Sequence, residues 1–357
     1  MQPDKNIVKS NIGIQNSDDE IEKSYKNTVK SWSDIEIRLK NKIRDIFEDL
    51  ELVIGYSPGR LAGRVSPHFI TEKKDIEKLV LNSFCINNLA SYAYFKSEEY
   101  KDRGKIGIIL KPCDVKSIVQ LISEGLLAKD KVYAIVIGCS GIIDFKKIQK
   151  QAGGSRIISV NVNENNVEAM VVDETINLEL SGLYADKCYS CNISDNPPYF
   201  DEFITNSEKL SITGRDNYAV VEQFENRDIA EVYAFWEKEF SRCIRCYACR
   251  NVCPLEVCRD RCITQLDMPN WQSQKIDSAE GKFFQQIRVF HLAGRCTECG
   301  ECERACPANI PIVTMMKKVN KDILRLFDFV PGMDAGAKPP LLTFKNVEKN
   351  IKEEELF

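Results

Sequence analysis

Apolar residues in the first half of the chain follow two different periods. From Ile21 to Leu50 they recur mostly at steps of three and four residues, which predicts a long helix with one buried face. Farther along, the apolar runs 106–110 and 132–137 flank a helical pattern at 115–121. Near-continuous apolar runs are typical of strands buried on both faces. We therefore expect an α/β fold with a mixed, mostly parallel sheet and flanking helices.

The second half of the chain changes character at about residue 226. Residues 153–184 are patterned as short strands and turns, whereas helical patterns at 228–240 and 313–329 flank a cysteine-rich stretch. Polar residues dominate the beginning of the chain, and Pro, Gly and Lys its end. We divide the sequence into a mobile arm (1–19), an α/β domain (20–225), a cysteine-rich domain (226–330) and a loosely held tail (331–357).

Composition excludes several classes of protein. The 357 residues are 43% hydrophobic and 29% charged, as in an ordinary globular protein. No apolar run approaches the roughly 18 residues of a membrane-spanning helix. The start lacks the basic flank and apolar stretch of a secretory signal, which predicts a cytoplasmic protein. The net charge of -4 lacks the excess of positive charge that is typical of nucleic-acid-binding proteins.

The cysteine count is the one abnormal number. Fifteen Cys, an odd number, in a reducing compartment indicate metal or redox chemistry and argue against a disulfide framework. The chain has two His, so mixed Cys/His zinc sites account for few of these thiols. All-thiolate iron–sulfur sites fit the composition better.

Two cysteine runs share one spacing, x2-x2-x3 followed by Pro. This is the spacing of bacterial two-cluster ferredoxins, in which the fourth cysteine of each run ligates the other 4Fe-4S cluster. A zinc ribbon is the alternative for paired Cys-x2-Cys, but the duplicated pattern favours iron–sulfur. We therefore expect a small α+β dicluster ferredoxin-like domain. The predicted ligands are Cys243, Cys246, Cys249 and Cys306 for one cluster, and Cys296, Cys299, Cys302 and Cys253 for the other.

The link between the two runs is unusually long. It has 42 residues and contains Cys258 and Cys262, which fit no ligand pattern by themselves. We interpret them as buried or incidental thiols; ligand exchange with Cys253 and a redox-labile pair remain alternatives.

A third set of cysteines falls in the α/β domain. Cys113 and Cys139 each follow a predicted strand, and parallel strands would bring them to the carboxyl edge of the sheet, where such folds bind ligands. Cys188 and Cys191 supply a further Cys-x2-Cys pair, which completes four thiolates for a third 4Fe-4S cluster. The alternative is that Cys113 and Cys139 are ordinary buried cysteines. This accounting leaves Cys85 outside any set, together with the two thiols of the link.

A turn with glycines and arginines follows the first predicted strand, 52–54. Small residues beside guanidinium groups can cradle a phosphate, and an ordinary surface turn is the alternative. The candidate contacts for a flavin diphosphate are Gly59, Arg60, Gly63 and Arg64.

The sequence segments 109–119 and 137–141, together with the Cys188–Cys191 pair, resemble sequences found in the beta subunits of coenzyme F420-reducing hydrogenases and dehydrogenases. Residues 290–312 resemble the dicluster ferredoxin unit of anaerobic electron-transfer subunits. The resemblance implies a flavoprotein with FAD, or less often FMN, and a flavin-proximal cluster held by Cys113, Cys139, Cys188 and Cys191. It also implies partner redox subunits in a hetero-oligomer, of heterodisulfide-reductase-like, hydrogenase, formate dehydrogenase or flavin oxidoreductase type.

A flavin combined with clusters converts two-electron into one-electron chemistry. The expected function is therefore an electron-transfer subunit of an anaerobic redox complex, an oxidoreductase component that connects a flavin with partner iron–sulfur proteins through three 4Fe-4S clusters. Three alternatives stay open: a flavin-free iron–sulfur conduit, a reductase with its own small-molecule site at a cluster, and a regulator that senses oxidation.

Overall fold

A computed structural model describes most of the chain from residue 30 onward. The predicted arm at 1–19 and the end of the predicted tail lie outside the described residues, as does the first part of the helix predicted from Ile21. The described residues are 30–172, 174–191, 193, 196–205, 216–258, 262, 266, 271–273 and 275–344.

The central element is a five-stranded sheet with the order β2-β1-β3-β4-β8. Strands β1, β3, β4 and β8 run parallel to one another, and β2 is antiparallel to β1. The α/β fold with a mixed, mostly parallel sheet is thereby confirmed. Its strands are β1 (Leu50–Pro58), β2 (Val65–Ile70), β3 (Lys105–Leu110), β4 (Val132–Ile137) and β8 (Glu202–Ile204).

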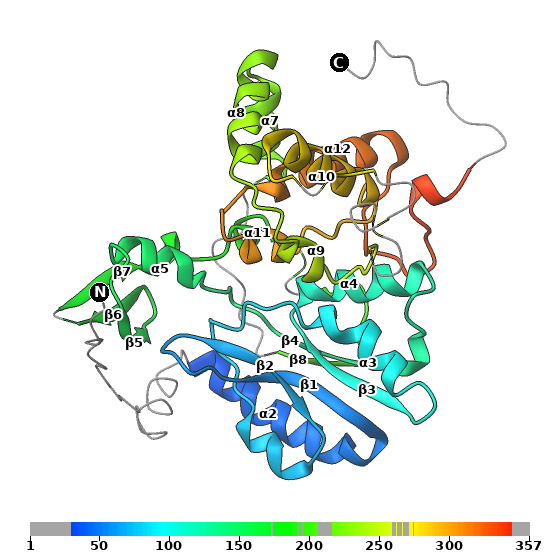
Figure 1. Cartoon of the computed structure of the whole chain (residues 1–357). Coiled ribbons are helices and arrows are strands. Elements are labelled where there is room, and N and C mark those ends of the chain that lie inside the picture. Colours follow the sequence, from blue (N-terminus) through cyan, green and yellow to red (C-terminus); the bar gives the residue numbers. More distant parts are fainter. Residues whose placement is uncertain are drawn as a thin grey trace, which may run out of the picture.

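Helices cover both faces of this sheet (Figure 1). Helix α2 (Lys30–Ile46) lies on one face and buries the predicted apolar stripe, with Trp32, Leu39 and Ile43 at most 1% exposed. Helix α4 (Pro112–Ser123) lies on the opposite side, toward the cysteine-rich part. Burial of β3 and β4 between these layers explains why their sequences are almost continuously apolar.

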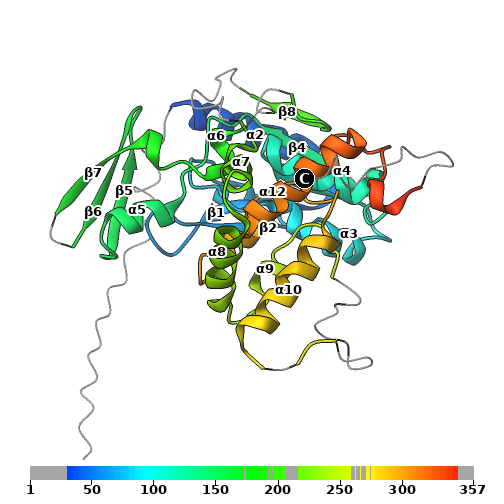
Figure 2. The same ribbon diagram turned by 90° about the horizontal axis from the view of Figure 1, so that it is seen from above.

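A second, smaller sheet stands beside the first (Figure 2). It is antiparallel, with the order β5-β6-β7, and has its own hydrophobic cluster around Phe145, Val167 and Leu183. Its alternating exposed and buried residues correspond to the short strands predicted at 153–184. The elements of this part are α5 (Phe145–Gln151), β5 (Ile157–Val162), β6 (Asn166–Val171), β7 (Thr175–Glu179) and α6 (Asp186–Tyr189).

The cysteine-rich part is helical and is stacked on the α4 side of the main sheet (Figure 1). A third hydrophobic cluster holds it together, with Phe240, Phe284 and Met316 buried at its centre. The helices predicted at 228–240 and 313–329 are both present. The helices of this part are α7 (Ala219–Glu225), α8 (Ile229–Ser241), α9 (Ala248–Asn251), α10 (Ser278–His291), α11 (Glu301–Ala305) and α12 (Ile312–Phe327).

Short helices complete the chain. Helix α3 (Ala93–Glu99) precedes β3, and the rest are 3-10 turns. These turns are Phe47–Asp49, Lys73–Lys78, Leu89–Tyr92, Lys129–Lys131, Leu180–Gly182 and Pro340–Leu342.

Polar contacts join α4 to the cysteine-rich part. The hydroxyls of Ser117 and Thr297, both buried, lie 3.0 Å apart. Arg295 forms a two-pronged ion pair with Glu124, whose side chain is 4% exposed. Because these groups lose water on contact, they fix the relative position of the two parts.

The start of the tail is packed, contrary to the prediction of a loosely held segment. The backbone N–H of Gly332 donates to Oε1 of Gln120 on α4 at 2.9 Å. A Cβ at Gly332, where φ is +74°, would lie 2.2 Å from the carbonyl oxygen of Lys116. The glycine is therefore needed for close approach to α4, a constraint that composition does not reveal.

Candidate functional site

Cys113 and Cys139 lie at the same edge of the main sheet. Strand β3 ends at Leu110 and Cys113 occupies the first turn of α4, whereas Cys139 follows the end of β4 at Ile137 by two residues. Because β3 and β4 are parallel neighbours, both cysteines lie at their carboxyl ends. The predicted juxtaposition is thus present in the fold.

Helix α6 brings Cys188 and Cys191 to this edge. The backbone N–H of Ala185 donates to Ile142 at 2.8 Å, which ties the start of α6 to the loop after β4. Burial raises the pKa of Cys139 to about 12, and the thiols of Cys188 and Cys191 contribute. Burial likewise raises the pKa of Cys113, with a contribution from Cys139. The four predicted thiols therefore lie close enough to interact electrostatically.

A buried ion pair lies under this edge. Lys111 and Asp114 are both fully buried, with Nζ and Oδ2 2.5 Å apart. The ammonium also donates to the Tyr56 hydroxyl at 2.8 Å and to the Asn87 carbonyl at 2.9 Å. Burial acts to lower the pKa of Lys111, but Asp114, Tyr56 and Cys113 together outweigh it and the pKa is raised. Sequence reasoning missed this network because one Lys and one Asp beside a cysteine carry no sign of burial.

Lys187 connects the edge with the cysteine-rich part. Its Nζ lies 3.4 Å from Oδ1 of Asp114. Burial acts to lower its pKa, but Asp114, Cys113 and, more weakly, Cys299 raise it well above the usual value. Lys187 is therefore a cation close to thiols of two different predicted cluster sites.

The first ferredoxin-type run encloses a cavity with a cysteine of the second run. Cys306, from the end of the second run, lies opposite the first three cysteines of the first run. Phe284 and Tyr247 close the cavity, and their rings meet edge-on at 5.2 Å. The cysteines that line this cavity are Cys243, Cys246, Cys249 and Cys306.

The second run encloses a matching cavity. Here the cysteine from the other run is Cys253, and apolar side chains such as Leu292 and Met316 form the walls. The structure thus brings together the crossed sets that the spacing predicts. The cysteines that line this cavity are Cys253, Cys296, Cys299 and Cys302.

The backbone of the two runs repeats one unusual conformation. In each run, the residues on both sides of the second cysteine are left-handed, and so is the third residue after the fourth cysteine. Alternation of this kind turns backbone N–H groups to one side and makes a concave anion-binding surface. All but one of these residues lack the freedom of glycine, so the strain marks a functional site. The φ angles are 48° at Arg245, 58° at Tyr247, 54° at Glu256, 58° at Glu298, 78° at Gly300 and 50° at Asn309.

Arg288 on α10 lies between the two cavities. Its side chain is 4% exposed, and Nη2 donates to the Cys249 carbonyl at 2.7 Å. Its Nε and Nη1 have no hydrogen-bond partner in the part of the chain that the structure describes. Burial acts to lower its pKa, but Cys302, Cys253 and Cys249 raise it. A buried guanidinium with open N–H groups fits a neighbouring anion.

Gln285 lies one turn before Arg288 on the same helix. Its Nε2 approaches the sulfurs of Cys243 at 3.7 Å and Cys249 at 4.0 Å. Sequence reasoning missed both α10 residues. The sequence did contain a signal for them. Asp277 caps the start of a helix, and Gln285 and Arg288, three residues apart, fall on one face of that helix.

The remaining cysteines differ in their surroundings. Cys85 is fully buried in the main core, where burial raises its pKa to about 12. Burial and a hydrogen bond with Cys262 raise the pKa of Cys258 to about 11, and Cys253 lies near enough to contribute. The prediction of buried or incidental thiols, made for Cys258 and Cys262, describes Cys262 well, whereas Cys258 lines an open cavity.

Within the described ranges, no three His, Cys, Asp or Glu side chains are grouped tightly enough to hold a single metal ion. The thiolates of a 4Fe-4S cube each bind a different iron, so they surround a larger volume than the ligands of one ion.

The predicted phosphate turn differs in part from expectation. The strand does not end before Gly55 but continues to Pro58 and forms a hairpin with β2. The turn at 59–64 follows at the carboxyl end of β1. Arg64 stacks over Phe145 at 4.3 Å and donates to Gln149 at 3.1 Å, while Arg60 is exposed.

A cavity of about 460 Å³ lies between the sheet edge and the second cysteine run. Lys187 and Ser190 line one side, beside the predicted third set, and Cys299 lines the other. Asp144 and Arg304 also line this cavity. Burial lowers the pKa of Arg64, and the charges of Asp144 and Arg304 are near enough to contribute to this pKa as well. The glycine–arginine turn is therefore close to this cavity, whose size is in the range of small-molecule sites.

None of the described helices combines the length and apolar character needed to cross a bilayer.

Comparisons with known proteins agree with this geometry. A model of the 4Fe-4S dicluster domain matches residues 239–310. The F420-dependent formate dehydrogenase subunit beta of Methanocaldococcus jannaschii is 24% identical over 341 residues, covering 79% of this chain and 86% of that protein. The F420-dependent formate dehydrogenase 1 subunit beta of Methanococcus maripaludis is 24% identical over 333 residues, covering 77% and 84%.

A solved chain from the F420-reducing NiFe hydrogenase complex of Methanosarcina barkeri matches more loosely. It is 14% identical, with a TM-score of 0.34 over 49% of this chain and 62% of that chain, and supports no conclusion about the fold. The resemblance inferred from sequence is confirmed by the curated relatives and the dicluster model. The chain is thus similar over most of its length to the beta subunits of F420-dependent formate dehydrogenases, and its residues 239–310 match the model of a 4Fe-4S dicluster domain.

Proposed function

We propose that the chain is the electron-transfer subunit of a larger redox complex, connecting a flavin with partner iron–sulfur proteins through three 4Fe-4S clusters. The observation that carries this proposal is the crossing of two cysteine runs into two cavities, with four further thiols at the sheet edge. A flavin supplies two-electron chemistry that can be released in single steps, which the clusters accept.

The dicluster assignments follow the two cavities. Cys243, Cys246, Cys249 and Cys306 hold one cluster, and Cys253, Cys296, Cys299 and Cys302 hold the other. The residues fit such clusters because the left-handed backbone around each second cysteine turns N–H groups inward. The open N–H groups of Arg288 supply further positive potential between them.

A third cluster is assigned to Cys113, Cys139, Cys188 and Cys191. Burial of Cys113, Cys139 and Cys188 disfavours their free thiolates, and metal coordination offsets this cost because a coordinating thiol is deprotonated. Lys187 and the Lys111–Asp114 pair fix the charge around this set. Lys187 also faces Cys299, so the cation lies between the third and second clusters.

The flavin, FAD or FMN, is assigned to the cavity of about 460 Å³ beside the sheet edge. Lys146, Lys187 and Lys317 line it and fit an anionic phosphate. We retain Gly59, Arg60, Gly63 and Arg64 as candidate diphosphate contacts. Of these, Arg60 is the exposed guanidinium, because Arg64 is engaged by Phe145 and Gln149.

The relatives' names support a hetero-oligomeric setting. Both are beta subunits of formate dehydrogenases that depend on F420. We infer that this chain works in the cytoplasm of an anaerobe with partner subunits of formate dehydrogenase, hydrogenase, heterodisulfide-reductase-like or flavin oxidoreductase type. Dependence on F420 itself is part of this proposal.

Quantifying iron, sulfide and flavin after anaerobic purification tests the proposal. We expect about twelve irons and one flavin per chain, because three cubes hold four irons each. About eight irons would remove the third cluster. If the protein holds about twelve irons but acid releases no yellow flavin from it, the alternative of a flavin-free iron–sulfur conduit would be favoured. Fewer than eight irons would contradict the dicluster assignment.

A further inference from the structure

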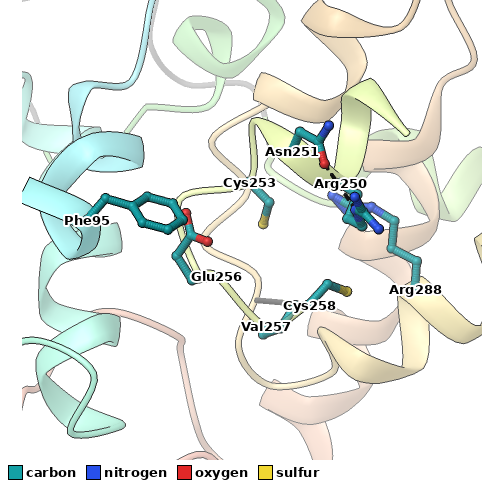
Figure 3. A pocket seen from close by; sticks show the side chains of 8 residues that line it. All are labelled: Phe95, Arg250, Asn251, Cys253, Glu256, Val257, Cys258 and Arg288. Atoms are coloured by element: carbon teal, nitrogen blue, oxygen red, sulfur yellow. Dashed lines mark hydrogen bonds between the residues drawn. The ribbon is translucent and has the colours of Figure 1, made fainter. Parts of the chain in front are cut away.

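A separate cavity of about 290 Å³ opens beside the second cluster site (Figure 3). It lies between α3, α9 and α10 and is distinct from the cavity assigned to the flavin. Its lining combines two arginines with apolar side chains and thiols. The lining residues are Phe95, Arg250, Asn251, Cys253, Glu256, Val257, Cys258 and Arg288.

Two guanidinium groups share one side of this cavity (Figure 3). Arg288 is 4% exposed and, within the described residues, its Nε and Nη1 lack a hydrogen-bond partner. Nη1 of Arg250 is also buried and unpartnered there, although its Nε donates to Asn251 at 3.0 Å. Buried N–H donors that lack an acceptor are costly, and an anion that pairs with both guanidinium groups would offset this cost.

The cluster sites do not account for both arginines. Arg288 also lines the cavity of the second cysteine run, so part of its donor capacity faces there. Arg250 does not line that cavity, and its guanidinium stacks 5.2 Å from the Tyr247 ring. The open donor of Arg250 therefore indicates a different anion.

The opposite side of the cavity is apolar and carries one acid. Phe95 lies across from the arginines, with the Glu256 carboxylate beside its ring (Figure 3). Phe95 is 54% exposed, so its ring face is accessible. An apolar wall favours a ligand with a hydrophobic body, and Glu256 disfavours a second negative charge at that end.

We propose that this cavity binds an organic monocarboxylate, with its carboxylate between Arg250 and Arg288 and its apolar body against Phe95 and Val257. Arg–carboxylate pairs are strong because two N–H groups match two oxygens. The site is independent of the proposed electron-transfer function, since binding requires no electron transfer.

Calorimetry on the full, anaerobically purified chain tests the site with benzoate and benzamide. The two probes have nearly the same shape, but benzamide lacks the charge. We expect benzoate to bind about tenfold more tightly, the factor that corresponds to about 1.4 kcal/mol. Equal affinity of the two probes, or no heat from either at tens of millimolar, would overturn the proposal.

Substitutions in the cavity test which residues cause the preference for benzoate over benzamide. Arg250→Gln should abolish the preference for benzoate, whereas Arg227→Gln, an exposed arginine outside the cavity, should leave it intact. Phe95→Ala should weaken both probes about three- to tenfold while keeping the preference, as expected for loss of one aromatic contact. Because Phe95 is exposed, its variant tests the site even if Arg250→Gln fails to fold. Persistence of the preference in folded Arg250→Gln would refute the assignment.

Discussion

Replacing Lys111 by Met should destabilise the chain strongly. The substitution keeps the volume of the side chain but removes the ammonium that pairs with Asp114 in the interior. Among the basic side chains of the described residues, the ion-pair partner left to Asp114 would then be Lys187, whose Nζ is 3.4 Å away. Removing one partner of a buried ion pair is strongly destabilising, because it leaves the charge of the other partner without compensation in the interior.

The magnitude follows from the contacts that Lys111 makes. Breaking a buried pair by removing one partner costs about 3 to 5 kcal/mol. The Tyr56 hydroxyl and the Asn87 carbonyl also lose their donor, but these two groups still bond to each other at 2.6 Å. Since Lys187 compensates part of the charge, we expect the low end, about 3 kcal/mol.

Urea unfolding followed by circular dichroism measures this loss, with iron content as a control for the clusters. The double variant Lys111→Met, Asp114→Asn removes both charges and should recover about 1 to 2 kcal/mol relative to Lys111→Met. Additive losses in the double variant would show that the two side chains are not coupled. A loss below about 1 kcal/mol for Lys111→Met would refute the reasoning on burial.

The pH dependence of this loss has a defined sign. The pKa of Lys111 is raised above its ordinary 10.5, because the combined attraction of Asp114, Tyr56 and Cys113 exceeds the effect of burial. Its stabilising contribution is therefore complete below pH 10.5 and declines as the pH rises toward the higher native pKa. The difference between wild type and Lys111→Met should stay constant from about pH 6 to 9. A difference that shrinks in this range would contradict a raised pKa.

Four further outcomes are expected. Cys113→Ala should lose about four irons while the dicluster domain keeps eight, and loss of all iron would mean that the sites assemble as one unit. Cys85→Ala should keep all iron and lose about 1 kcal/mol of stability in urea unfolding, since it removes one buried sulfur; iron loss would give this thiol a ligand role. Arg295→Gln should cost about 2 kcal/mol by the same assay, because Glu124 is left buried; a loss under 0.5 kcal/mol would show a solvated pair. Gln285→Leu should lower the reduction potential of the Cys243 cluster in an EPR titration, because N–H groups that approach the sulfurs stabilise the reduced form; an unchanged potential would contradict this.

The sequence predicted those features of the fold and the site that depend on residues close together in the chain. The fixed spacing around Cys243 and Cys296 determines how each loop folds, so the crossed cavities were predictable. The apolar runs of β3 and β4 placed Cys113 and Cys139 at one edge because parallel strands end together. These features need only local geometry and one rule of topology.

Features that depend on tertiary burial were not predictable. Lys111 and Asp114 have the appearance of surface residues in the sequence, and their burial follows from the packing of the 3-10 turn Leu89–Tyr92 and the cysteine-rich part on α4. Arg288 belongs to a helix whose cysteine neighbours lie in other segments. Strand β8 has three residues, too few for a periodic pattern, and is defined by its pairing with β4.

The crossing of the two runs has a consequence for how the chain is made. Cys306, which completes the first cavity, follows Cys249 by 57 residues, and Cys253 must wait for the run that starts at Cys296. During synthesis, neither set of four thiols is complete until nearly the whole dicluster domain has left the ribosome. Iron delivery to these cysteines is then a late event, and the first thiols stay exposed to oxidation until the last one arrives.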